Sequence, residues 1–487
     1  MITVRTGTAL FVVMLMAAAA GARTITPSDT LVATVRATVE ESRFGSSLAA
    51  GDLDGDGRIE LVVGAPGLSS VGGAPLAGAV YVLSRPFPAV PDAPFVRSGS
   101  ERDQFGAAVI VDDLTGDGLD DLIVSAPGAS PRGRAAAGAV NIWFGPVDSP
   151  RDPDVTVEGA LPGDRFGVAL LVADVTNDTH ADLIVAAPRG GSPDRVGFGT
   201  VSIIPGRTLA ALSGPVGIAD IAAATVRGDA RGDALSAVTS GDLDGDGLLE
   251  LIVGAPHADG DDYDFVDAGR VGVFTLEPDV SDTLLLSEGA ALVDGPDARG
   301  FLGAALAAAD LTGDGNDELI IGAPTGGSKR YGGLVSGQAY LLFGSEEGLP
   351  VRTKLAESDP TRFYSHRWQL LGAAVAAEDL DGDRTGDLVL GAPFLPCDGE
   401  ETRCGGVFYY RGSLRSVVAA KAGSADRAEM VFLGELPDGG AGGALATADL
   451  NGDGGSELIV GAPEAASLDE GPRAGAVHVI DSAAFVR

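Results

Sequence analysis

The chain has 487 residues, more than a single hydrophobic core usually holds, so we expect several domains or a repeat architecture. Its formal net charge of −36 argues against nucleic acid and anionic membrane surfaces as partners. A hydrophobic content of 45% excludes a largely disordered chain, and 72 glycines indicate many turns between short strands.

The N-terminus has the features of a secretory signal peptide. Arg5 precedes an apolar run over residues 9–20 that is short for a membrane span, and small residues at 20–22 fit a cleavage site. We therefore predict a signal peptide over residues 1–22 and a mature chain over residues 23–487 that is secreted, periplasmic or attached to the cell surface. An uncleaved membrane anchor is the alternative. No later run is long and apolar enough to span a membrane.

Seven copies of one motif follow along the chain. The sequence LIVGAP, or a near copy, occupies residues 61–66, 122–127, 183–188, 251–256, 319–324, 388–393 and 458–463. An aspartate-rich loop precedes each copy, and the loops begin at Asp52, Asp113, Asp174, Asp242, Asp310, Asp379 and Asp449. Chance does not produce seven ordered copies, so the chain consists of repeats of one structural unit.

Each unit has the same internal order. A Phe-Gly pair or a variant comes first, as in Phe44-Gly45, and is followed by a small apolar run, the aspartate-rich loop and the LIVGAP run. A third run such as 78–83 and a weaker fourth run such as 154–159 complete the unit. Short runs rich in Val and Ile, bounded by Gly, Pro and Asp, indicate strands. Four strands repeated seven times predict an all-β fold, a seven-bladed β-propeller.

The last blade is short of one strand. Its first three strands are expected near residues 443–450, 458–461 and 476–480, and only seven residues follow. Residues 31–39 form a strand-like run before the first Phe-Gly pair. We therefore expect this N-terminal strand to pair as the outer strand of the last blade and close the ring.

The aspartate-rich loops have the composition of a cation site. The first loop, DLDGDGRIE, places carboxylates at positions 1, 3, 5 and 9, glycines at positions 4 and 6, and a free backbone carbonyl at position 7. Several charged oxygen ligands favour calcium over magnesium or zinc. An EF-hand would need Glu at position 12, where Val63 stands, and flanking helices. The alternative is that the loops are solvated hairpin turns.

Two of the seven loops depart from the pattern. The third has no glycine and carries His180 at position 7, and the sixth has Arg384 in place of the second glycine. We expect these two loops to bind calcium most weakly.

Phe-Gly, the aspartate-rich loop and Gly-Ala-Pro together resemble the FG-GAP repeats of integrin α-subunit propellers, over nearly the whole mature chain. In that family the loop joins strands 1 and 2 of a blade and binds calcium on the lower face, with the position-7 residue coordinating through its carbonyl. The resemblance implies up to seven calcium ions, one per blade. The implied ligands are Asp52, Asp54, Asp56, Arg58, Glu60, Asp113, Thr115, Asp117, Leu119, Asp121, Asp174, Thr176, Asp178, His180, Asp182, Asp242, Asp244, Asp246, Leu248, Glu250, Asp310, Thr312, Asp314, Asn316, Glu318, Asp379, Asp381, Asp383, Thr385, Asp387, Asp449, Asn451, Asp453, Gly455 and Glu457.

The resemblance also implies a function in binding or adhesion without catalysis. The ligand, a protein or a glycan, is expected at the upper-face loops that join strands 2–3 and 4–1. Two such loops, 257–268 and 325–336, carry a possible aromatic and charged patch, for which ordinary loop variation is the alternative; its residues are Tyr263, Phe265, Lys329, Arg330 and Tyr331. Two Arg-Gly-Asp tripeptides, at 227–229 and 231–233, are interpreted as part of the repeat rather than as adhesion ligands.

Two other functions remain open. A calcium-dependent enzyme acting on polysaccharides could be built on a propeller, although the four histidines are spread over four blades and no catalytic motif appears. A calcium-stabilised structural protein of the cell surface differs from an adhesion module only in its partner.

Cys397 and Cys404 are the only cysteines and flank a turn-rich segment. In an oxidising compartment this spacing suits a disulfide that closes the loop, whereas two free thiols would be expected in the cytosol.

Overall fold

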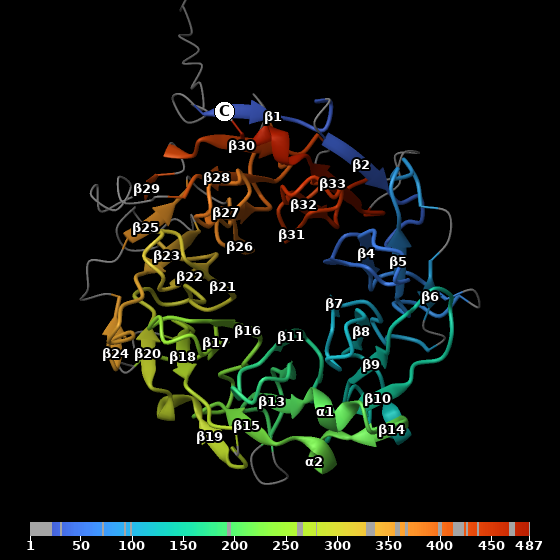
Figure 1. Cartoon of the computed structure of the whole chain (residues 1–487), viewed down its shortest axis with the longest axis vertical. Helices are drawn as coiled ribbons and strands as arrows, with labels where there is room; N and C mark the ends of the chain where they lie inside the picture. The colour runs from blue at the N-terminus through green and yellow to red at the C-terminus, as the bar shows by residue number, and fades with distance from the viewer. Residues whose placement is uncertain are drawn as a thin grey trace, which may run out of the picture.

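The computed structural model describes residues 22–29, 32–70, 73–91, 94–97, 100–191, 196–260, 266–278, 280–327, 337–355, 361–365, 369–397, 402–412, 423–424, 427–435, 438–466 and 473–486. Seven sheets of this described part form a ring around a central axis (Figure 1). The fold is therefore the seven-bladed β-propeller that the repeats predict. The short helices of these residues include α1 (Gly206–Leu209), α2 (Ile218–Ile221) and the 3₁₀ turns Pro131–Gly133, Leu286–Glu288 and Ser482–Ala484.

The strands follow the order of the repeats, and each blade is an antiparallel sheet of four. Blade 1 contains β3 (Ser47–Gly51), β4 (Glu60–Ala65), β5 (Ala79–Leu83) and β6 (Val96–Arg97). Blade 2 contains β7 (Val109–Asp112), β8 (Asp121–Ala126), β9 (Ala139–Trp143) and β10 (Val155–Glu158). Blade 3 contains β11 (Ala169–Ala173), β12 (Asp182–Ala187), β13 (Thr200–Pro205) and β15 (Ala224–Arg227). Blade 4 contains β16 (Ala237–Gly241), β17 (Glu250–Ala255), β18 (Arg270–Phe274) and β20 (Ala291–Asp294).

Blade 5 contains β21 (Ala305–Ala309), β22 (Glu318–Ala323), β23 (Gln338–Leu342) and β25 (Thr361–Tyr364). Blade 6 contains β26 (Val375–Glu378), β27 (Asp387–Ala392), β28 (Gly406–Tyr410) and β30 (Met430–Leu433). Blade 7 contains β31 (Ala444–Ala448), β32 (Glu457–Ala462), β33 (Ala476–Ile480) and β2 (Val32–Arg36). We call the end of the ring with the strand 1–2 loops the lower face and the opposite end the upper face.

The N-terminal strand closes the ring as predicted. β2 pairs antiparallel with β33, with Val32 opposite Ile480 and Arg36 opposite Ala476. Figure 1 shows the first strands of the chain beside the last ones. Blade 7 is thus built from both ends of the chain, which leaves no gap with two unpaired strand edges at this position.

Five blades carry a fifth strand that the sequence did not indicate. These strands are β1 (Arg23–Ile25), β14 (Gly214–Gly217), β19 (Thr283–Leu285), β24 (Arg352–Lys354) and β29 (Gly423–Ser424). Each pairs in parallel with the outer strand of a blade and comes from the segment that leads to the outer strand of the next blade. The fifth strands therefore tie neighbouring blades together at the rim.

The glycines of the repeat sit where blades touch. A Cβ on Gly64, from the Gly-Ala-Pro of blade 1, would lie 2.1 Å from the carbonyl oxygen of Gly106 in blade 2. At the ring closure a Cβ on Gly461 would lie 2.2 Å from the carbonyl oxygen of Gly45. Because real side chains do not approach this closely, Gly64 and Gly461 require glycine, whereas blades 2 and 3 have Ser125 and Ala186 at the equivalent position.

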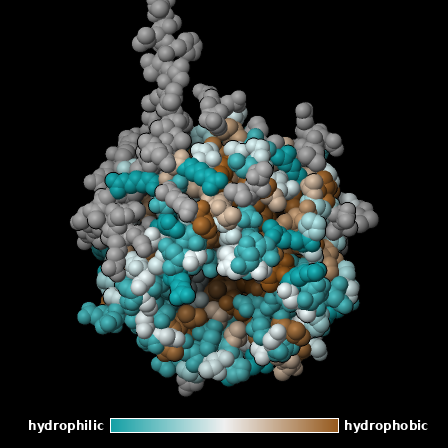
Figure 2. Space-filling model, turned by 45° about the horizontal axis from the view of Figure 1, so that its top comes forward, coloured by the Kyte–Doolittle hydropathy of each residue, from teal (hydrophilic) through white to brown (hydrophobic). Residues whose placement is uncertain are grey.

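The hydrophobic core lies between blades rather than within them. Phe44 and Tyr81 of blade 1 pack in one cluster with Ile459 and Val477 of blade 7. All seven second strands are buried along their length, whereas first strands such as β11, β21 and β31 are half-buried. These inner strands surround a hollow whose wall carries hydrophobic residues (Figure 2). Since no blade buries its faces alone, the ring is one folding unit.

Candidate functional site

The seven aspartate-rich loops share one hydrogen-bonding pattern at the lower face. In the first loop, the Asp52 carboxylate accepts hydrogen bonds from the backbone N–H groups of Gly55 at 2.9 Å and Gly57 at 2.8 Å. The first aspartate of every other loop accepts an equivalent bond from position 6, at 2.7–2.9 Å. The position-5 aspartate accepts one from the N–H of position 7 in all seven loops. The first aspartate thus organises the loop backbone.

Positions 4 and 6 have left-handed backbone conformation in every loop. Glycine occupies most of these positions. In the first and fourth loops, for example, φ is near +75° at position 4 and near +87° at position 6. Loop 3 adopts the same shape with Asn177 at φ +56° and Thr179 at φ +71°, and loop 6 with Arg384 at φ +72°. Loop 3, which lacks both glycines, and loop 6, which lacks the second, are therefore folded like the others but hold side chains in a strained conformation.

The acid at position 9 begins the second strand and is buried in every blade. Glu60, Asp121, Asp182, Glu250, Glu318, Asp387 and Glu457 are each no more than 5% exposed. Most of them accept a hydrogen bond from the backbone N–H of position 2, as Glu318 does from Leu311 at 2.8 Å. Burial, with a further contribution from neighbouring carboxylates, raises the pKa of Glu250 and of Glu318 to about 7. A carboxylate buried among others either takes up a proton or is paired with a cation.

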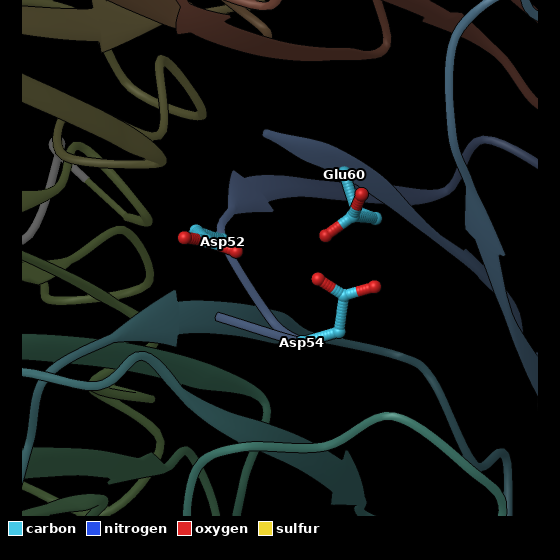
Figure 3. Close-up of side chains that lie close together, drawn as sticks. All are labelled: Asp52, Asp54 and Glu60. Carbon is cyan, nitrogen blue, oxygen red and sulfur yellow. The ribbon is translucent and has the colours of Figure 1, made fainter. Parts of the chain in front are cut away.

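Three loops bring three carboxylates close enough to share one ion. The groups are Asp52, Asp54 and Glu60 in blade 1, Asp242, Asp244 and Asp246 in blade 4, and Asp379, Asp381 and Asp387 in blade 6. Within each group, one oxygen from each residue lies within 4.8 Å of the others. In blade 1 the carboxylates of Asp54 and Glu60 face each other, with Asp52 to one side (Figure 3). An all-oxygen, carboxylate-rich set fits a hard cation such as calcium.

The remaining predicted ligands are less closely gathered. Blades 2, 3, 5 and 7 have a Thr or Asn at position 3 and form no group of three acids within the described chain. In blade 2 the Thr115 hydroxyl oxygen is buried and has no hydrogen-bond partner among the described residues, so its lone pairs are available to coordinate a cation. Asp56 and Asp383, at position 5, lie outside the groups of blades 1 and 6.

The upper face has a groove that the sequence did not reveal. It has a volume of about 540 Å³ and is lined by loops of blades 3 and 4, including Arg189, Val196, Arg231 and His257. The His257 imidazole contacts the Asp267 carboxylate at 3.1 Å and packs edge-on against Phe301. Sequence reasoning missed this groove because its residues come from separate loops of unremarkable composition. The predicted patch of Tyr263, Phe265, Lys329, Arg330 and Tyr331 lies outside the described residues, as does the signal peptide up to residue 21.

The Arg-Gly-Asp tripeptides are structural parts of the upper face. Asp233 is 5% exposed, and its carboxylate accepts a hydrogen bond from the Ala230 N–H at 2.9 Å. Asp229 accepts hydrogen bonds from the N–H and hydroxyl of Ser287. Both aspartates are therefore engaged within the protein rather than displayed to a partner.

Cys397 and Cys404 are joined by a disulfide, with the two Cα atoms 5.0 Å apart. The bridge closes the strand 2–3 loop of blade 6 on the upper face. None of the described helices is long and apolar enough to cross a membrane.

Comparison with known proteins assigns the repeats to a family. The FG-GAP repeat matches six segments, residues 44–83, 105–143, 166–204, 234–274, 302–342 and 441–480. The chain is an FG-GAP repeat protein. The segment between the fifth and sixth matches corresponds to blade 6, which has the same strands and loop in the structure and, like blade 5, a Leu-Gly pair in place of Phe-Gly.

Relatives of this FG-GAP protein include phospholipases and integrin alpha subunits. Human phosphatidylinositol-glycan-specific phospholipase D is 28% identical over 413 residues, which are 76% of this chain and 46% of that protein. Human integrin alpha-IIb is 31% identical over 251 residues, 50% of this chain and 22% of that protein. Integrin alpha-PS2 of Drosophila melanogaster is 36% identical over 160 residues, 30% of this chain and 11% of that protein. The chain thus spans less than half the length of these relatives.

Proposed function

We propose that this FG-GAP protein is a secreted or cell-surface binding module whose propeller is stabilised by calcium. The observation that carries the proposal is the set of seven lower-face loops, which share one backbone conformation and each hold a buried acid at position 9. Calcium accepts six to eight oxygen ligands in flexible geometry, which suits loops of carboxylates, carbonyls and hydroxyls. When bound, the ion would neutralise the carboxylates of Asp52, Asp54, Glu60 and their equivalents in the other blades.

The disulfide supports a location outside the cytosol. Disulfides such as Cys397–Cys404 form and persist in oxidising compartments and are rare where thiols are kept reduced. The apolar N-terminal run over residues 9–20 supports the same location, because it has the length and flanks of a signal peptide.

We place the ligand, a protein or a glycan, at the upper face. The groove between blades 3 and 4 supports this placement, because it combines a cavity of about 540 Å³ with the guanidinium groups of Arg189 and Arg231. Neither arginine forms an ion pair within the described part of the chain. Arginine is also enriched among the residues that contribute most to binding energy at protein interfaces.

An enzyme is the second candidate, favoured by the similarity to phosphatidylinositol-glycan-specific phospholipase D. The groove offers one group for such chemistry, His257 with its Asp267 partner. Assays for cleavage of a glycosylphosphatidylinositol and of polysaccharides, with a His257→Gln control, separate the two candidates. Turnover that this substitution abolishes would replace the binding proposal by an enzymatic one.

Binding to arrays of glycans and purified extracellular proteins tests the proposal. The protein should retain a ligand in calcium and lose it in excess chelator. Arg189→Glu combined with Arg231→Glu should weaken retention about tenfold or more, because both substitutions reverse a charge in the groove. Arg102→Glu is the matched control, since this arginine is on the same face but outside the groove and its side chain is 75% exposed. Equal retention with and without calcium, by all variants, would refute the proposal.

A further inference from the structure

Among the described residues, two lower-face loops are contacted by an arginine from the end of the third strand of their own blade. In blade 3 the guanidinium of Arg207 lies 2.8 Å from the Asp178 carboxylate. In blade 6 the guanidinium of Arg411 contacts the Asp381 carboxylate and lies 3.7 Å from that of Asp383. In each case a fixed positive charge lies against carboxylates that the loop would otherwise present to a metal ion.

The two arginines occupy related places in the fold. Arg411 is the first residue after β28, and Arg207 is the second residue after β13, so both lie at the end of the third strand of their blade. Each is next to a glycine that docks on the loop. The N–H of Gly206 donates to the carbonyl oxygen of Ala181 at 3.0 Å, and the N–H of Gly412 donates to the Asp387 carboxylate at 2.5 Å. The docked backbone holds the guanidinium beside the loop.

The aspartate side chains that the two arginines contact are shielded from solvent. The Asp178 side chain is 6% exposed and the Asp381 side chain is fully buried, whereas Asp56 in loop 1 is 45% exposed. Asp381 also belongs to the group of three acids in blade 6 whose oxygens lie within 4.8 Å of one another. Arg411 therefore lies against the group that a cation would use. Loop 1 contains Arg58, but its side chain is 84% exposed and lies 3.8 Å from Asp56, so it leaves the carboxylates accessible.

Blades 2 and 5 have phenylalanine at the position of Arg411, and blade 1 has Arg85 two residues after β5, whose charge acts on Glu457 of loop 7 rather than on its own loop. Phe144 precedes the glycine that docks on loop 2, and Phe343 precedes the equivalent Gly344 in blade 5. Gly145, after Phe144, donates to the Asp121 carboxylate at 2.8 Å, just as Gly412 does to Asp387. The docking contact is thus shared, and within the described residues an arginine at the end of the third strand pairs with a carboxylate of its own blade's loop in blades 3 and 6.

We infer that Arg207 and Arg411 act as built-in cations that replace calcium in blades 3 and 6, so that the protein binds five calcium ions rather than seven. This inference rests on the proposed calcium binding and deepens it. The guanidinium compensates the loop carboxylates without any ion, because its positive charge and its N–H donors complement the negative charge and the acceptor oxygens of carboxylates. Blades 3 and 6 then stay ordered when calcium is withdrawn, while the other five depend on it.

Counting bound ions tests the inference. The full mature chain is dialysed to equilibrium against buffered free calcium at physiological ionic strength, and bound metal is measured by atomic absorption. We expect five ions for the natural protein, six for Arg207→Gln or Arg411→Gln, and seven for the double variant. Arg411→Phe is a second variant that keeps the packing, since Phe144 and Phe343 occupy that position in other blades. Arg58→Gln removes the same charge from loop 1 and should leave the count at five.

The possible failures are distinguishable. Seven ions in the natural protein, or five in the double variant, would overturn the arginine inference and leave the proposed calcium binding standing. Absence of bound calcium from every variant would overturn the proposed function itself.

Discussion

Thr179 and Arg384 hold a backbone conformation that glycine fills in the other loops. Both stand at position 6, with φ of +71° and +72°. A left-handed conformation costs a residue with a Cβ about 1–2 kcal/mol, and part of the gain from glycine is lost to the greater freedom of the unfolded chain. Thr179→Gly and Arg384→Gly should each raise the free energy of unfolding by about 0.5–1 kcal/mol, measured by denaturant titration in chelator.

The matched control for these substitutions is Gly247→Ala at position 6 of loop 4. Its φ is +87° and a Cβ there would meet no atom within 4 Å, so the change tests backbone strain alone. It should destabilise the protein by about 1 kcal/mol. If the glycine variants were less stable than the natural protein, the side chains of Thr179 and Arg384 would have to contribute more than the strain they cause.

His478 predicts a pH dependence of stability. The side chain is 4% exposed, and its Nδ1 atom lies 3.0 Å from the Thr34 hydroxyl at the ring closure. Burial, with repulsion from Arg36, lowers the pKa of His478 from 6.5 to about 3. Between pH 6.5 and pH 3, His478 is therefore protonated in the unfolded chain but neutral in the folded chain. The free energy of unfolding falls as the pH drops through this range.

The expected size of this effect is about 2 kcal/mol between pH 7 and pH 5, at about 1.4 kcal/mol per pH unit below the unfolded pKa. Denaturant titrations of the natural protein and of His478→Gln at both pH values isolate it, because every other group titrates in both proteins. His478→Gln should lose less stability on acidification. The same loss in both proteins would mean that His478 is protonated in the folded state.

At the level of elements, β1 extends blade 6 whereas β2 closes the ring, and N-terminal truncations distinguish these two structural roles. Removal of the chain up to Ile25 takes away β1, which is the fifth strand of blade 6, and leaves the ring closed. Removal up to Arg36 also takes away β2 and leaves β33 with an unpaired edge at the ring closure. Exposed strand edges pair with other chains. We expect the shorter truncation to be a monomer that unfolds cooperatively and the longer one to aggregate.

Size-exclusion chromatography and thermal unfolding measure this difference. The shorter truncation is the control, because it removes one strand without opening the ring. Should the longer truncation remain a monomer with an unchanged melting temperature, closure by β2 would not be important for stability.

The sequence predicts the strands and loops that recur in every repeat. The features that depend on contacts between distant segments are seen only in the structure. The strands, the loops and the pairing of residues 31–39 with the last blade follow from runs of seven similar units and from the missing outer strand. β14 and β29 were not predicted, because strands of two to four residues have no periodicity to detect. Arg207 and Arg411 lie 29 and 30 residues after the aspartates they contact, so no local pattern links them to the loops.

The whole ring depends on how its charge is balanced. The formal net charge is −36, and three or four carboxylates are concentrated in each lower-face loop. Without metal these like charges repel one another at close range. Burial of carboxylates such as Glu318 also costs desolvation free energy. Because neighbouring blades share their hydrophobic cores, repulsion in one loop lowers the stability of the entire ring. Each bound calcium would remove two negative charges and supply the missing partner.

Calcium should therefore raise the melting temperature of the whole molecule. A site occupied at 100 times its dissociation constant adds about 2.7 kcal/mol, and five such sites would match the whole stability of a typical domain, about 5–15 kcal/mol. We expect thermal melts in calcium to lie about 10 °C or more above those in excess chelator. Magnesium should restore little of this difference, since it demands tighter octahedral geometry and gives up its waters reluctantly. A melting temperature that is the same in chelator, calcium and magnesium would mean that the loops are turns and not metal sites.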